Sequence, residues 1–113
     1  MKKTTLLITF LSILAHTLLA YNSPDKIRIP NQVAESIKAN AERQWPDDYS
    51  MQEYEIKEQS KAYKKVQHWI YQNRYNKVYK EIAENAQRQW HEDYTMQFYE
   101  IERQVEAFNS INK

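Results

Sequence analysis

Residues 40–63, NAERQWPDDYSMQEYEIKEQSKAY, are repeated with substitutions 45 positions later as residues 85–108, NAQRQWHEDYTMQFYEIERQVEAF. Fourteen of the 24 aligned positions are identical, and four more are conservative exchanges. The same offset relates Val66 to Ile111, so each copy fills nearly the whole period. A period of this length is typical of a supersecondary unit that buries its apolar face against a neighbouring copy. We therefore expect one compact domain built from one motif used twice.

Each copy is predicted to be a helical hairpin. The first arm carries apolar and small residues at the i, i+4 and i+8 spacing of one helix face. These residues are Val33, Ile37 and Ala41 in the first copy, and Val78, Ile82 and Ala86 in the second. Pro46 disfavours helical geometry at Trp45 and marks the end of the first arm. The second arm is expected to begin at about residues 48–50, because Asp48 and Ser50 are competing N-cap residues.

The predicted architecture is all-α, with about four helices in a small bundle. The first hairpin covers residues 31–72, the second covers residues 76–113, and residues 21–30 form a linker. Residues 67–78 contain no proline or glycine, so a single continuous helix through this segment is the alternative. The repeat favours a break near residues 73–76, where asparagine can serve as a left-handed C-terminal residue or as an N-cap.

The N-terminal segment has the pattern of a secretory signal peptide. Residues 1–20, MKKTTLLITFLSILAHTLLA, combine two lysines, an apolar stretch and no acidic residue. Polar residues interrupt the apolar stretch, which makes it a poor membrane anchor. We expect cleavage after Ala20 and a periplasmic or secreted protein without stable membrane insertion.

The composition excludes several classes of site. The chain has no cysteine and no glycine, which removes disulfides, thiolate metal sites, cysteine nucleophiles and glycine-rich phosphate loops. Without residues 1–20 it holds 14 basic and 15 acidic residues, so it lacks the excess of positive charge expected for nucleic-acid binding. We expect no nucleic-acid partner and no cofactor.

Comparison of the two copies predicts which face of the second arm is packed. Positions that differ between the copies fall mainly on one arc of the helical wheel, and three of them reverse charge. This arc is predicted to face solvent; its pairs are Glu53/Phe98, Lys57/Glu102, Glu58/Arg103, Ser60/Val105 and Lys61/Glu106. The opposite arc, which includes Tyr49 and Ile56, is predicted to be packed. Tyr54 and Tyr99 are identical although they lie on the variable arc.

The predicted packed arc is polar, which suggests a hydrogen-bonded network between the arms. We expect an Arg43–Glu55 ion pair, repeated as Arg88–Glu100, within a network of hydrogen-bonded side-chain amides. A network that fixes the hairpin register, a polar groove for a ligand and simple exposure are the three interpretations. The candidate residues are Arg43, Gln44, Trp45, Gln52, Glu55, Gln59, Arg88, Gln89, Trp90, Gln97, Glu100 and Gln104.

The aromatic residues allow a structural and a binding interpretation. Trp45 and Trp90 are expected to cap the hairpin cores, with an exposed recognition site as the alternative. Trp69 and the tyrosines between the hairpins, Tyr71, Tyr75 and Tyr79, are expected to fill the contact between them or to form a patch for a protein or a glycan.

No set of residues supports catalysis. Asp47, Asp48, Glu92 and Asp93 have a structural explanation as helix caps, and His91 aligns with Pro46, so the two copies do not share a histidine. Neither a zinc-protease motif nor a calcium loop is present. We expect neither an enzyme nor a metal site.

The segments Trp45–Gln52 and Trp90–Gln97 resemble a short motif, W-P-D-D-Y-x-M-Q, that recurs in small, uncharacterised bacterial proteins. The resemblance covers about two dozen residues per copy and implies a small helical module, with no activity, substrate or cofactor. His91 departs from the proline of the motif, which would leave the second turn less constrained.

The sequence thus leads to two functional hypotheses. The first is an exported protein-interaction or structural module whose partner is another protein or a second molecule of the same chain. The alternative is a periplasmic protein that binds a small ligand or a metal on the polar arc of each hairpin.

Overall fold

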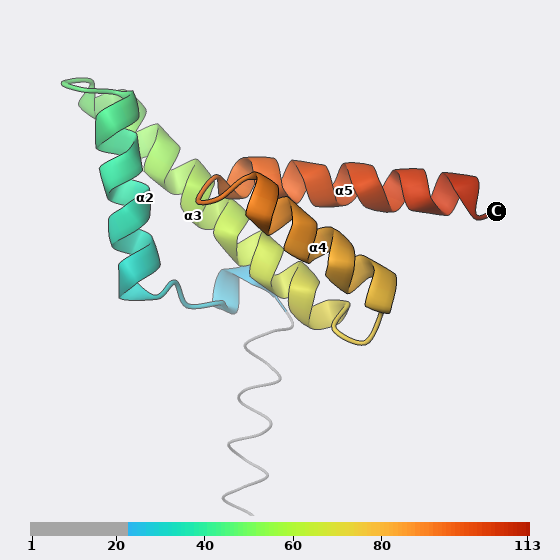
Figure 1. Ribbon diagram of the computed structural model, residues 1–113. Coiled ribbons are helices and arrows are strands. Elements are labelled where there is room, and N and C mark those ends of the chain that lie inside the picture. The colour runs from blue at the N-terminus through green and yellow to red at the C-terminus, as the bar shows by residue number, and fades with distance from the viewer. Residues whose placement is uncertain (1–22) are drawn as a thin grey trace, which may run out of the picture.

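The computed structural model describes residues 23–113, and in this part of the chain all regular secondary structure is helical (Figure 1). The elements are η1 (Pro24–Lys26), α2 (Asn31–Gln44), α3 (Tyr49–Gln72), α4 (Lys77–Gln89) and α5 (Tyr94–Ile111). The predicted all-α fold is therefore confirmed. The predicted signal peptide, residues 1–20, lies outside the described residues. We refer to residues 31–72 as the first repeat and to residues 76–113 as the second.

An aspartate starts the second helix of each repeat. The backbone N–H of Met51 donates to Asp48 Oδ1 at 3.1 Å, and that of Met96 donates to Asp93 Oδ1 at 3.2 Å. Ser50, the competing candidate, instead donates its hydroxyl to Asp48 at 2.9 Å. The N-cap carboxylates thus satisfy backbone donors that no carbonyl of the helix can reach.

The turn between the two arms has the same shape in both repeats. A backbone hydrogen bond joins Asp48 N to Trp45 O at 3.3 Å, and Asp93 N joins Trp90 O at 3.1 Å. The third turn residue has a positive φ, 63° at Asp47 and 62° at Glu92. The second turn keeps this geometry although it lacks the proline of the first. A positive φ strains residues with a Cβ atom, and in this chain without glycine an acidic residue accepts that strain.

The join between the repeats is broken, as the favoured alternative predicted. α3 ends at Gln72, and α4 begins after Asn76, whose side chain accepts from the backbone N–H of Tyr79 at 3.0 Å. Asn73 has a φ of −108°, so it is not the left-handed residue considered from sequence. Its amide donates to the carbonyl of Trp69 at 2.8 Å and covers the exposed end of α3.

The long helix α3 is common to both halves of the fold. α2 packs against α3 in the first hairpin, while α4 packs with α5 in the second and α5 also crosses α3 (Figure 1). The main core cluster consists of Val66 on α3, Ala83 and Ala86 on α4, and Ile101 on α5. Alanines let these helices approach closely, so the core is thin and few large side chains are fully buried.

The prediction for the variable arc is wrong for two residues of the second repeat, whereas Glu102, Arg103 and Glu106 are exposed as predicted. Phe98 and Val105 pack against the core cluster instead of facing solvent, and Lys65 Nζ lies 5.6 Å from the centre of the Phe98 ring. These residues are apolar because α5 uses this face to contact α3. The packed-arc prediction is also wrong for Tyr49, whose surface is 75% exposed.

The strained turn makes a testable prediction. Asp47→Gly should raise the free energy of unfolding by about 0.5 kcal/mol, because glycine removes the penalty of positive φ but gains entropy in the unfolded chain. Asp47→Val should lower it by about 1 kcal/mol or more, because a β-branched residue is poorly accommodated there. Chemical denaturation measures both values. Equal stability of the two variants would contradict the assigned role of the turn.

Candidate functional site

A polar groove lies between the two arms of the first repeat. Its helical lining, from α2 and α3, consists of Ile37, Asn40, Gln44, Glu55 and Gln59. The other side is formed by the turn that precedes α5, residues 91–93 of the second repeat. We call this the first groove; it encloses about 310 Å³. The turn of one hairpin thus lies in the groove of the other.

Gln59 is the central residue of the first groove. It is buried on α3, and its Oε1 accepts from the backbone N–H of Tyr94 at 2.7 Å. Its Nε2 donates to Asp93 Oδ1 at 3.1 Å and lies 3.3 Å from the Thr95 hydroxyl oxygen. A further bond of 3.0 Å joins Nε2 to Glu55 on the same helix. One side chain therefore satisfies backbone and side-chain groups at the first turn of a helix from the other repeat.

A second polar contact holds the same turn. Asn40 on α2 donates to Glu92 Oε2 at 3.3 Å. Hydrogen bonds from the Ser36 hydroxyl and the Asn40 amide lower the pKa of the Glu92 carboxyl below its ordinary value of 4.5. The fold therefore favours the ionised form of Glu92.

An aromatic pair closes one side of this contact. The rings of Tyr63 and Tyr94 meet edge to face, with centroids 5.1 Å apart. Burial raises the pKa of the Tyr94 hydroxyl above its ordinary value, so this group stays protonated at neutral pH. The pair adds apolar contact to the hydrogen bonds around Gln59.

The second repeat contains an equivalent groove. Its lining residues, from α4 and α5, are Ile82, Asn85, Ala86, Gln89, Glu100 and Gln104, and it encloses about 270 Å³. We call this the second groove. Gln104 Nε2 donates to Glu100 Oε1 at 2.9 Å, which repeats the bond between Gln59 and Glu55. Hydrogen bonds from Arg103 and then Gln104 lower the pKa of Glu100. No turn from the described chain lines this second groove.

The two predicted ion pairs do not form in the described structure. Arg43 instead donates to Asn40 and Arg88 to Asn85, in both cases one helical turn away on the same arm. Glu100 pairs with Arg103 at 2.7 Å. Contacts within one helix form instead because residues three apart on a helix are neighbours, whereas an ion pair between the arms would have to span the groove.

Hydrogen bonds from side-chain amides near the turn do connect the two arms of each hairpin. Gln52 Nε2 donates to the Trp45 carbonyl at 2.8 Å, and Gln97 Nε2 donates to the Trp90 carbonyl at 2.9 Å. Both tryptophans are half-buried, and in each the indole Nε1 is covered without a hydrogen-bond partner. Gln97 Oε1 is also buried and unpaired. The indole nitrogens of both tryptophans are thus withdrawn from solvent.

The aromatic residues at the join divide into two groups. Tyr79 packs near Trp69 and Phe108, with ring centroids 5.7 and 6.3 Å away. Tyr75 is 89% exposed, and the Arg74 guanidinium lies over its ring at 4.5 Å. Core filling therefore describes Tyr79 but not Tyr75.

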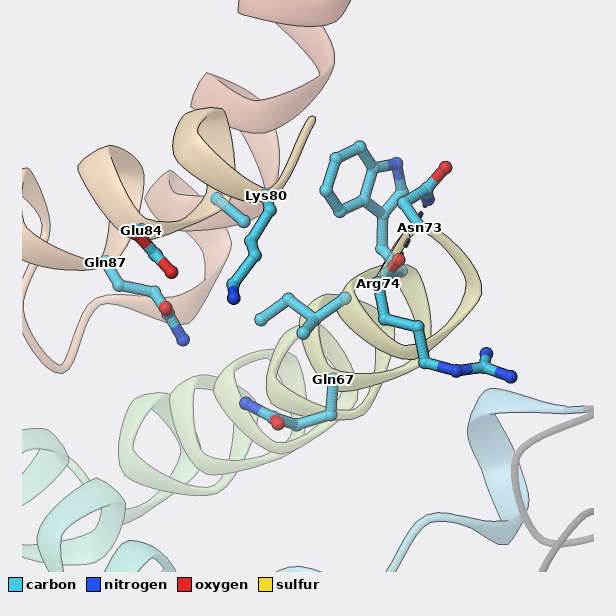
Figure 2. Close-up of a pocket in the computed structure, with 9 residues that line it drawn as sticks. Gln67, Asn73, Arg74, Lys80, Glu84 and Gln87 are labelled. Atoms are coloured by element: carbon cyan, nitrogen blue, oxygen red, sulfur yellow. Dashed lines mark hydrogen bonds between the residues drawn. The ribbon is translucent and has the colours of Figure 1, made fainter. Parts of the chain in front are cut away.

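A further cavity of about 330 Å³ lies between the end of α3 and α4 (Figure 2). In the close-up, Lys80 and Gln87 extend from α4 toward the space above α3, while the Arg74 guanidinium points away from it. The floor is apolar and includes Ile70 and Ala83 of the core region. The residues labelled in Figure 2 form no arrangement of nucleophile and base.

Residues 23–113 contain neither a cluster of metal-ligand side chains nor a membrane-spanning helix. No group of three or more histidine, aspartate or glutamate side chains in this range is arranged to hold a metal ion. None of the helices there has the length and apolar character needed to span a membrane. Comparisons with protein-family models, with curated proteins and with solved structures find no match for this chain.

Sequence reasoning placed Gln59 in a network within its own hairpin and missed its contact with the second repeat. It also assigned no binding role to Asn40 or to the turn residues 91–93. One signal was available: Phe98 and Val105 replace Glu53 and Ser60. A change from polar to apolar between copies marks a contact that only one copy makes, whereas a charge reversal marks a solvent-facing position.

The bonds of Gln59 predict a difference between two repeat-related substitutions. Gln59→Ala should lower the free energy of unfolding by about 1–3 kcal/mol, because groups around the start of α5 lose their partner. Gln104→Ala should lower it by less than about 1 kcal/mol, because Gln104 bonds only to Glu100 on its own helix. Denaturation at low micromolar concentration compares the two variants. Equal losses would show that Gln59 does not join the repeats.

The lowered pKa of Glu92 predicts a pH dependence. Because the carboxylate is favoured in the folded state, its contribution to stability is present above the ordinary value of 4.5 and is lost as pH falls through the lower folded value. Glu92→Gln should therefore flatten the decline of unfolding free energy as pH falls below 4.5. Glu102→Gln, on the exposed face of α5, is the control. An unchanged slope in Glu92→Gln would contradict the assignment.

Proposed function

We propose that this chain is a small exported protein-interaction or structural module that acts in the cell envelope or outside the cell. The pattern of residues 1–20 supports export, since a basic start, an apolar stretch and a small final residue are typical of a secretory signal. The grooves of the hairpins are the proposed means of interaction.

The second groove carries this proposal. Every helical residue of the first groove has an identical counterpart in the second, 45 positions later. The first groove holds a polypeptide turn through Gln59 and Asn40. The same amides stand in the second groove as Gln104 and Asn85, which no turn of the described chain contacts. A surface with these groups is suited to bind the first turn of a helix.

The distribution of exposed aromatic residues agrees with a role in binding. Tyr54 and Tyr99 are 57% and 59% exposed at the same position of the two repeats. Neither side chain is needed for the core cluster, which contains Val66 and Ile101. Exposed tyrosines are frequent in protein interfaces because the ring gives apolar contact and the hydroxyl gives a hydrogen bond.

A photo-crosslinking experiment tests the proposed function. Gln89, an exposed residue of the second groove, is replaced by benzoylphenylalanine in the full-length chain, and cells that express it are irradiated. Because the groove is expected to hold a protein segment, a discrete adduct larger than the chain should form. Mass spectrometry of the adduct identifies the captured protein.

The repeat supplies a matched control for this experiment. Gln44 occupies the same position in the first groove, which the turn before α5 already lines. Benzoylphenylalanine at residue 44 should therefore give little or no intermolecular product. Absence of an adduct from residue 89, or equal adducts from both positions, would contradict the proposed function.

A further inference from the structure

Each repeat of the described chain has one turn between its arms and one groove between them, but only the turn of the second repeat and the groove of the first meet. The turn of the second repeat, residues 90–95, lies against the first groove. No such contact is made in the described chain by the turn of the first repeat, residues 45–50, or by the second groove. These two surfaces belong to different repeats.

The turn of the first repeat already has the conformation of the turn that is bound. The backbone φ of its third residue, Asp47, differs by one degree from that of Glu92, which is 62°. Asp48 accepts from the Ser50 hydroxyl at 2.9 Å, and the corresponding bond from Thr95 to Asp93 is also 2.9 Å. No rearrangement of this turn is needed before it can bind a groove of the same kind.

Most of the chemical groups at the contacts of the bound turn match. Two do not: Ser36, whose hydroxyl bonds Glu92, corresponds to Glu81, and His91 corresponds to Pro46. Carboxylates at positions 92 and 93 correspond to Asp47 and Asp48, and the hydroxyl of Thr95 corresponds to that of Ser50. Tyr94 corresponds to Tyr49. On the groove side, Asn40, Gln59 and Tyr63 correspond to Asn85, Gln104 and Phe108.

We infer that the second groove binds the turn of the first repeat of another molecule of this chain, so that molecules associate head to tail. This inference rests on the proposed function, because it names the partner of the same groove. In the complex, Gln104 of one molecule accepts from the backbone N–H of Tyr49 in the next and donates to Asp48. Asn85 donates to Asp47, and the Tyr49 ring meets Phe108.

Exposure of large apolar residues supports the inference independently of the grooves. Ile111 is 81% exposed at the end of α5, whereas Val66, its repeat counterpart on α3, is completely buried against the second repeat. Tyr49 is 75% exposed, whereas its counterpart Tyr94 is partly buried beside Tyr63. Each exposed residue occupies a position that is covered where the two repeats of one chain meet.

The intermolecular contact is weaker than the contact within the chain. Phe98, Val105 and Ala83 contribute apolar area to the internal contact, but their counterparts are Glu53, Ser60 and Lys38. The internal turn is also held at high effective concentration by the chain itself. Association should therefore depend on protein concentration. Because the two binding surfaces differ, each added molecule leaves one groove and one turn free unless the assembly closes into a ring.

Paired variants test the head-to-tail arrangement. Tyr49→Glu places a carboxylate against the Phe108 ring of the next molecule, and Gln104→Glu places one opposite Asp48. Each variant alone should show an association constant reduced at least about tenfold in sedimentation equilibrium. Mixed together, they should form a 1:1 dimer in native mass spectrometry, because each retains the surface that the other needs. That dimer should not grow, since both of its remaining ends are blocked.

Controls separate this result from misfolding and from other modes of association. Glu106→Gln, on the exposed side of α5, should associate as the unmodified chain does. Circular dichroism melts should show that both blocking variants remain folded; if Gln104→Glu does not, Gln104→Ala replaces it. A monomeric unmodified chain at all concentrations would overturn the inference, as would a failure of the two variants to pair. Capture of a different protein at residue 89 would then leave the proposed function standing, whereas absence of any adduct would remove both.

Discussion

The Gln59 side chain, in the middle of α3, joins the two hairpins through hydrogen bonds to the start of α5. Its amide both accepts and donates, so it can satisfy a backbone N–H and the cap carboxylate of the same helix end. This contact helps to fix the position of α5 relative to α3, together with the Tyr63–Tyr94 ring pair and the apolar packing around Val66 and Ile101. A polar bond inside a thin core is directional, and it helps to fix where the second hairpin lies.

The thin core explains why a repeated hairpin is useful to this protein. Within residues 23–113, four of the eight buried apolar residues are alanines, and alanine gives close helix contact but little buried area. A single hairpin of this kind buries little apolar surface between its own arms. Each hairpin therefore gains stability by packing against a neighbouring hairpin. Within one chain, however, only one of the two grooves is covered. The proposed interaction through the second groove follows from the same physical need that joins the two repeats.

The differences between the repeats describe the contacts that each repeat makes. Phe98 and Val105 contact the core because α5 crosses α3, and the corresponding positions Glu53 and Ser60 on α3 remain polar. The polar residues of the groove, in contrast, are the same in both repeats, although within the described chain only Gln59 and Asn40 of the first groove bond to the turn of the other repeat. Identity at positions with unequal contacts is more naturally explained by binding than by the folding of a single chain. The proposed head-to-tail contact gives Gln104 the role that Gln59 already has.

The sequence alone determined the all-α class, the two hairpins, the turns at Trp45 and Trp90, and the break near Asn76. These features depend on local physics, namely helical periodicity, N-cap chemistry and the effect of proline on the preceding residue. It also identified Gln59 and its counterpart Gln104 as candidate site residues. Only the tertiary structure decided that Arg43 bonds within its own helix, that Phe98 is packed, and that Gln59 contacts the other repeat. Local spacing cannot reveal which face of a helix meets a distant segment, because that choice depends on how the two hairpins cross in space.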